Sequence, residues 1–247
     1  MPLNKNKIGI AIAIAVLAVL AAACEAPRNT RRETRTVDPG GAARVEARIN
    51  MGAGELRIRG AGQTALLDAS FEFSRERYRP EVEYRLLGDK GVLDVRHARH
   101  RNFHFGLGTN RNRWDLVLGN ALPLDLNIDL GAGRSDLDLQ GLKLQRVEID
   151  MGVGEMNLDL RGPHDAGFLV RIDGGVGSGD LRLPAEVGVR VKVDGGLGSV
   201  DAHGLTKQHG AYVNEAYGKS AVSIEVEIDA GIGSIDLRCE PSPQMNI

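Results

Sequence analysis

Cysteine and aromatic residues are scarce in this sequence, which limits what can hold its fold together. Of 247 residues, 2 are cysteine and 4% are aromatic. No disulfide framework can be built, so stability must come from buried aliphatic side chains and backbone pairing. Glycine, in contrast, occurs 32 times. This composition predicts many tight turns around a core of Val, Ile, Leu and Ala.

The sequence also lacks the motifs of several functional classes. It contains no GxSxG, HExxH or Walker motif, and no glycine pair completes GxGxxG. The formal net charge of −2 gives no reason to expect nucleic acid. His164, His203 and His209 have no nucleophile beside them in sequence. We therefore expect no catalytic residues, no cofactor and no metal.

The N-terminus has the pattern of an export signal. Lys5 and Lys7 precede an apolar run of 16 residues, 8–23, that is short for a membrane span. The run ends in LAAAC (20–24), which resembles a bacterial lipobox although Ala21 takes the usual leucine place. We expect residues 1–23 to be removed and Cys24 to carry lipid that anchors the protein to a membrane. An ordinary secretory signal with an incidental cysteine is the alternative.

Residues 24–42 follow as an expected lipid-anchored, flexible tether. This stretch has no apolar period and is rich in Arg, Pro and Gly. The rest of the chain divides into an N-terminal β part, 43–126, and a repetitive part, 127–247. Within the first part, 65–73, 80–87, 91–97 and 113–119 have the pattern of strands in a meander.

One pattern recurs six times along the chain and organises it. Each copy alternates apolar and polar residues on both sides of a Gly-x-Gly. Glycine is expected there because the chain must bend, with φ > 0 and close contact with the neighbouring copy. The copies are 48–58, 127–137, 148–158, 171–181, 192–202 and 227–237. The predicted turn glycines are Gly52, Gly54, Gly131, Gly133, Gly152, Gly154, Gly175, Gly177, Gly196, Gly198, Gly231 and Gly233.

The repeat predicts an all-β fold, a parallel β-solenoid-like stack of coils about 22 residues long. A single coil cannot bury its own apolar face, whereas stacked coils can. One interior column is predicted from Ile128, Ile149, Ile172, Val193 and Ile228, and a second from Ala132, Val153, Val176, Leu197 and Ile232. An antiparallel sandwich that reuses one turn is the alternative.

Charged residues suggest two further surfaces. Two polar columns should face outward, one through Asn50, Asp129, Asp150, Asp173, Asp194 and Asp229, the other through Arg57, Asp136, Asn157, Asp180, Asp201 and Asp236. Solvated or turn-capping aspartates explain them better than calcium does. The arginine-rich segment 96–113 also contains His97, His100 and His104, which lack a carboxylate or cysteine to complete a metal site. It is either a solvated loop or a patch for an anionic ligand, formed by Arg96, Arg99, Arg101, Arg111 and Arg113.

Several motifs in order resemble the toast-rack domains of bacterial cell-envelope proteins. They are INMGAGELRI (49–58), RPEVEY (79–84), WDLVLGNALPLDLNIDLGAG (114–133), GVRVKVDGGLGSV (188–200) and NEAYGKSAVSIEVEIDAGIGS (214–234). The resemblance implies an envelope location and a β-stack. It links the chain to LiaF-type regulators of the response to cell-wall antibiotics and to adhesin-like proteins, and it supplies no catalytic residues.

The combined expectation is a non-catalytic, lipid-anchored cell-envelope protein, in the outer membrane if the host is Gram-negative. Its β-stack would bind an envelope polymer or a partner protein. One alternative is a sensor or regulatory component of an envelope-stress response. Another is a polysaccharide-acting solenoid enzyme whose acids lie in the aspartate columns.

Overall fold

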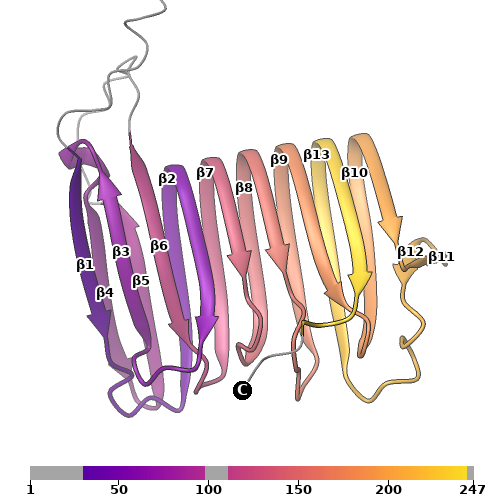
Figure 1. Cartoon of the computed structure of the whole chain (residues 1–247), viewed down its shortest axis with the longest axis horizontal. Helices are drawn as coiled ribbons and strands as arrows, with labels where there is room; N and C mark the ends of the chain where they lie inside the picture. The colour runs from indigo at the N-terminus through magenta and orange to yellow at the C-terminus, as the bar shows by residue number, and fades with distance from the viewer. Residues whose placement is uncertain (1–29, 98–110, 244–247) are drawn as a thin grey trace, which may run out of the picture.

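Six long strands dominate the computed structural model, which describes residues 30–97 and 111–243. Each runs without a break through its Gly-x-Gly and folds back on itself, so that it has the shape of a U (Figure 1). The glycine pairs therefore bend one continuous strand, as the expected turns required, without ending it. The six are β2 (Arg44–Ala61), β7 (Leu124–Asp138), β8 (Leu144–Asp159), β9 (Phe168–Pro184), β10 (Gly188–His203) and β13 (Ser223–Glu240).

These U-shaped strands stack in parallel, and the core lies between their two arms. Neighbours pair residue for residue, as in Ile128 beside Ile149 and Ile149 beside Ile172. The column of Ile128, Ile149, Ile172 and Ile228 is buried, and Val193 packs against it at the end of the stack. The predicted all-β, solenoid-like stack is confirmed, and its first interior column is correct.

The order of the last two U-shaped strands differs from their order in the sequence. β13 lies between β9 and β10, pairing in parallel with both. The longer interval before the last repeat holds β11 (Thr206–Gln208) and β12 (Ala211–Val213). β12 pairs antiparallel with the first arm of β10. Strand β10 is thus the last U of the stack. The spacing of the repeats alone does not specify that β13 pairs between β9 and β10.

Two antiparallel extensions replace the expected N-terminal meander. β5 (Lys90–His97) and β6 (Asn112–Gly119) pair in parallel with the first and second arms of β2, so together they occupy the place of another U. β4 (Pro80–Leu87) then extends β5, and β3 (Leu67–Phe73) extends β6. A 3₁₀ turn, Glu76–Tyr78, lies between β3 and β4.

Part of the predicted flexible tether is also a strand. β1 (Arg31–Val37) pairs antiparallel with β3 along its whole length. Arg32 binds Glu72 and the Thr36 hydroxyl donates to Asp68 at 2.7 Å, so the polar side chains that suggested a linker instead bind the neighbouring strand. Residues 24–29 of the tether, Cys24 included, lie outside the described residues.

Candidate functional site

The most unusual surface of the molecule is the edge at which all six U-shaped strands bend. We call it the bend edge and define it by residues 52–54, 131–133, 152–154, 175–177, 196–198 and 231–233. A Cβ at Gly177 would lie 1.8 Å from the carbonyl oxygen of Gly154, and a Cβ at Gly175 would lie 2.4 Å from that of Gly152. Gly177 also has φ +156°, which side chains rarely allow. The backbones of successive strands therefore approach too closely for any residue but glycine.

The residue between the two glycines points outward, contrary to expectation. Val153, Val176 and Ile232 were predicted to form an interior column, but they are 54%, 47% and 54% exposed. The alternation restarts at the bend, so the middle residue lies on the outer, convex side of the U. Ala132 is half-buried and the side chain of Leu197 lies outside what the structure describes. The second predicted column is therefore wrong.

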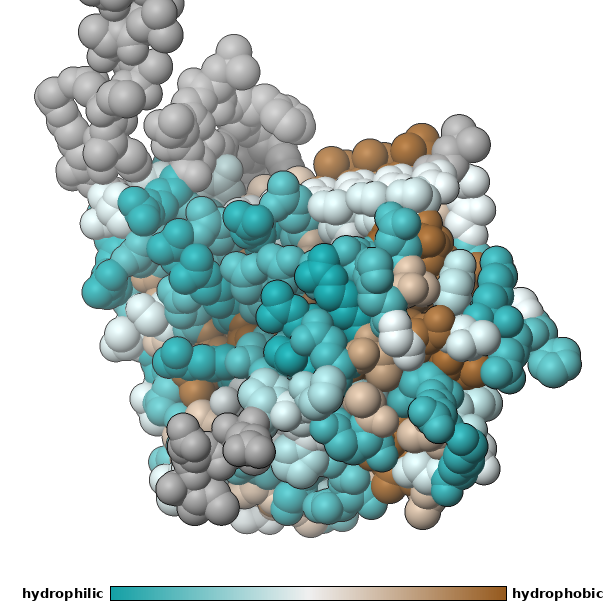
Figure 2. Space-filling model, turned by 45° about the vertical axis from the view of Figure 1, so that its right-hand side comes forward, coloured by the Kyte–Doolittle hydropathy of each residue, from teal (hydrophilic) through white to brown (hydrophobic). Residues whose placement is uncertain are grey.

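Val153, Val176 and Ile232 instead form a continuous apolar ridge. They are in register on β8, β9 and β13, which are adjacent strands. Figure 2 shows a row of hydrophobic residues along this edge, beside pale glycines. Large exposed apolar groups in a row typically mark an interaction surface. The ridge is thus the strongest candidate for a binding surface among the described residues.

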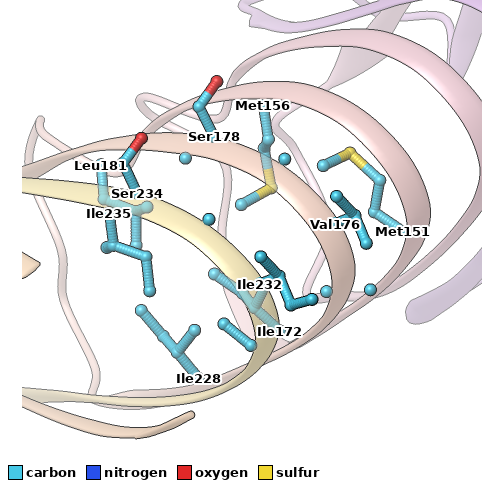
Figure 3. Close-up of a pocket in the computed structure, with 16 residues that line it drawn as sticks. Met151, Met156, Ile172, Val176, Ser178, Leu181, Ile228, Ile232, Ser234 and Ile235 are labelled. Atoms are coloured by element: carbon cyan, nitrogen blue, oxygen red, sulfur yellow. The ribbon is translucent and has the colours of Figure 1, made fainter. Parts of the chain in front are cut away.

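A small apolar cavity lies beneath the ridge (Figure 3). It measures about 50 Å³, and its walls include Met151, Met156, Ile172, Ile228 and Ile235. The cavity exists because two glycines of β9 replace large side chains of β8: Gly174 stands beside Met151, and Gly179 beside Met156. A second hollow, of about 180 Å³, continues past Ala230 toward Tyr212. The stack is therefore incompletely filled under the ridge.

Acidic side chains flank the ridge on the first arm. Asp150, Asp173 and Asp229 are exposed and stacked in register. Partial shielding from water raises the pKa of Asp150, and the carboxylates of Asp173, Asp129 and Glu148 add to this shift. The predicted outward column therefore exists, and its carboxylates repel one another. At its ends, Asn50 donates to Asp129 at 2.7 Å and Lys192 binds Asp194 at 2.5 Å.

The second polar column lies on the other arm and is better neutralised. Asn157 donates to Asp136 at 2.7 Å, and Arg57 lies 3.5 Å from the same carboxylate. Arg238 bridges Asp180 at 3.2 Å and Asp236 at 2.5 Å. Within residues 30–97 and 111–243, no three His, Cys, Asp or Glu side chains converge as a metal site would require.

The described members of the predicted anionic-ligand patch are each paired with a carboxylate. Arg96 contacts Glu81 at 3.1 Å and Glu83 at 2.6 Å. Arg113 binds Glu55, and Arg111 lies 3.3 Å from Glu72. Arg99 and Arg101 lie outside the described residues. An anionic ligand would therefore have to displace carboxylates from three of the five arginines, and the patch stays a prediction.

His97 is a structural residue that the sequence analysis considered only as a metal ligand. It packs edge-on against Trp114 with ring centroids 4.8 Å apart, and its Nδ1 accepts the Gly52 amide at 3.3 Å. Burial lowers the pKa of its imidazole. The ring thus closes the core where β5 and β6 meet the bend of β2. His100 and His104 lie outside the described residues.

A family match and one crystal structure agree with this architecture. Residues 26–183 match the family described as "N-terminal domain of toast_rack, DUF2154". A crystal structure of a "putative cell adhesion protein" from Clostridium sporogenes ATCC 15579 is 30% identical with a TM-score of 0.79, covering 86% of this chain and 100% of that one. A "putative adhesin" from Bacteroides fragilis NCTC 9343 is 11% identical with a TM-score of 0.24, covering 85% and 97%. No curated protein matches. In the described part of the chain, no helix has the length and hydrophobicity needed to cross a bilayer.

Proposed function

Because the chain belongs to the toast-rack family, we propose that it is a non-catalytic, lipid-anchored cell-envelope protein whose β-stack binds an envelope component or a partner protein. The observation that carries this proposal is the apolar ridge, in which three exposed apolar side chains stand in register on adjacent strands. A stack that only had to fold would gain nothing by exposing them.

The N-terminal sequence supports the anchored location. A charged start, a short apolar run and a small-residue stretch before Cys24 are typical of a lipoprotein signal. Glu25 follows the cysteine, in place of the aspartate that retains lipoproteins at the inner membrane of Gram-negative bacteria. The outer membrane is the proposed destination in such a host. The description of the Clostridium relative as a "putative cell adhesion protein" is consistent with a surface role.

The geometry of the acidic residues supports a binding role over a catalytic one. A glycosidase needs two carboxyl groups within about 5 to 10 Å on either side of its substrate. Here the two columns lie on the outer sides of opposite arms, with the core between them. Within a column the carboxylates form a straight row rather than facing across a cleft.

Two experiments test the proposal. Metabolic labelling with a clickable fatty acid should mark the wild-type protein and leave Cys24→Ser unmarked. Unlabelled wild-type protein would refute the lipid anchor. Capture from intact envelope should then recover a partner with the wild type, and much less of it with the triple variant Val153→Ser, Val176→Ser, Ile232→Ser. Equal recovery by both would remove the ridge from the binding surface.

A further inference from the structure

The chain enters the fold at the level of the bend edge. Arg31 pairs with Phe73, and Phe73 pairs with Asn112. Because Arg113 stands beside Glu55, Asn112 lies level with Gly54, which belongs to the bend edge. Figure 1 shows β1 starting at the side where the long strands bend. An anchor on the residues that precede β1 would therefore lie close to the bend edge.

Only six residues, 25–30, separate Cys24 from Arg31. Fully extended, the steps from Cys24 to Arg31 span at most about 25 Å. The opposite edge of the stack lies one arm away, and the seven residues of β1 measure about 23 Å. To bring that opposite edge to a membrane, the linker would have to run fully stretched along the protein. A relaxed linker brings the bend edge to the membrane instead.

The ridge projects where such a contact would form. Each of its side chains is flanked on both sides by glycine, so no neighbouring side chain on the same bend stands higher. From β1, the strands β3, β6, β2 and β7 lead to the first ridge strand, β8. At about 4.8 Å per strand, this places the ridge about 24 Å along the edge from the anchored corner. The anchor and the ridge would then hold two separate points of one edge.

Charge decides which lipid headgroups suit the ridge. The groups facing the ridge are Asp150, Asp173 and Asp229 on the first arm, with Glu155, Ser178 and Ser234 on the second. Glu155 is paired with Arg134 at 2.7 Å, which leaves a net negative surround. An anionic headgroup layer would repel it, whereas a zwitterionic one would not.

We infer that the bend edge lies on a zwitterionic phospholipid surface, with Val153, Val176 and Ile232 inserted among the headgroups. The stack would then stand on the membrane and display its two outer faces sideways. This inference rests on the proposed lipid anchor and gives the ridge its partner, the bilayer itself. The interface is shallow because the ridge is only one side chain deep.

The test uses the full lipidated protein in phosphatidylcholine vesicles, with one tryptophan added at a time. Val176→Trp places a reporter on the ridge, and Leu87→Trp places one at the opposite edge, where the leucine is 62% exposed. Trp114 is fully buried and provides a constant background. We expect the ridge reporter to shift to the blue and to lose emission in vesicles of brominated phosphatidylcholine. The Leu87→Trp reporter should do neither.

The outcomes separate this inference from the proposed function. Protein that fails to float with vesicles would refute the anchor. Protein that floats while the ridge reporter is unquenched, or while both reporters are quenched equally, would refute the membrane contact. A partner protein on the ridge would appear as an unquenched reporter that responds to envelope extract. Adding phosphatidylglycerol should weaken the quenching, and stronger quenching would overturn the charge argument.

Discussion

Replacing Gly177 by alanine should open the stack, whereas replacing Gly174 in the same strand should not. At Gly177 the new Cβ would lie 1.8 Å from the Gly154 carbonyl oxygen, on a backbone with φ +156°. Neither part of this conflict can be relieved by turning a side chain, because the atom in the way is backbone. At Gly174 the nearest heavy atom beyond its two chain neighbours, the Asp229 carbonyl oxygen, would be 4.0 Å from the new Cβ, and the added methyl would enter the apolar cavity.

The structure allows the size of this contrast to be worked out. The φ strain at Gly177 costs about 1 to 3 kcal/mol. Moving the strands apart weakens about two ladder hydrogen bonds, each worth about 1 kcal/mol. A loss of about 3 to 5 kcal/mol lowers the melting temperature of a domain this size by about 10 °C. Gly174→Ala restricts the unfolded chain and should stabilise by about 0.4 to 1 kcal/mol.

Thermal unfolding followed by circular dichroism is the assay, with Ser178→Ala as the matched control. Ser178 is exposed and adjacent to Gly177, so its replacement should change stability by less than about 0.5 kcal/mol. Two results would contradict the claim that the close approach of the strands requires glycine. One is a Gly177→Ala variant with the same melting temperature as Ser178→Ala. The other is a Gly174→Ala variant whose melting temperature falls as far as that of Gly177→Ala.

Three further predictions concern charge. Asp150→Asn should raise the melting temperature at neutral pH, because a carboxyl whose folded pKa is raised destabilises the fold when charged; the gain should vanish as the pH falls below the ordinary value of 3.8, and a gain that persists there would contradict the charge explanation. Burial lowers the pKa values of His97 and His164, so the free energy of unfolding from urea titrations should fall as the pH drops below about 6.5, where only the unfolded chain takes up the protons. A His97→Gln, His164→Gln double variant should flatten this pH dependence. An unchanged pH dependence would show that other groups cause it. Millimolar calcium or EDTA should leave the melting temperature unchanged, and a rise with calcium that Asp173→Asn with Asp194→Asn abolishes would show that the acidic columns bind it.

The local pattern was enough to predict the strands and the stack. Alternation on both sides of each glycine pair identifies two half-buried arms, and the recurrence of the pattern requires neighbours that bury them together. The interior isoleucines followed from this reasoning because their positions lie within regular strand, where side-chain direction is fixed by parity. The extensions β3, β4, β5 and β6 were likewise recognisable as strands.

Strand alternation does not predict side-chain direction where the chain bends, and it does not predict which strands pair when they are distant in sequence. Two glycines in three residues reset the alternation, so the direction of Val176 could not be read from its neighbours. The position of β13 between β9 and β10 depends on contacts between segments distant in sequence. β1 was missed because it is an edge strand of Arg, Thr and Glu, whose polar side chains give no apolar period. The apolar ridge was therefore among the residues that the sequence analysis placed in the core.

The most direct test of the account is photo-crosslinking in living cells from a benzophenone amino acid at Val176, with the same group at Leu87 as control. The account predicts that the Val176 probe forms adducts with envelope lipid in the wild-type background and loses them in Cys24→Ser, whose anchor is absent. Adducts from Leu87 alone, or from neither position while the protein remains in the envelope, would contradict the claim that the bend edge is the surface this protein presents to its membrane.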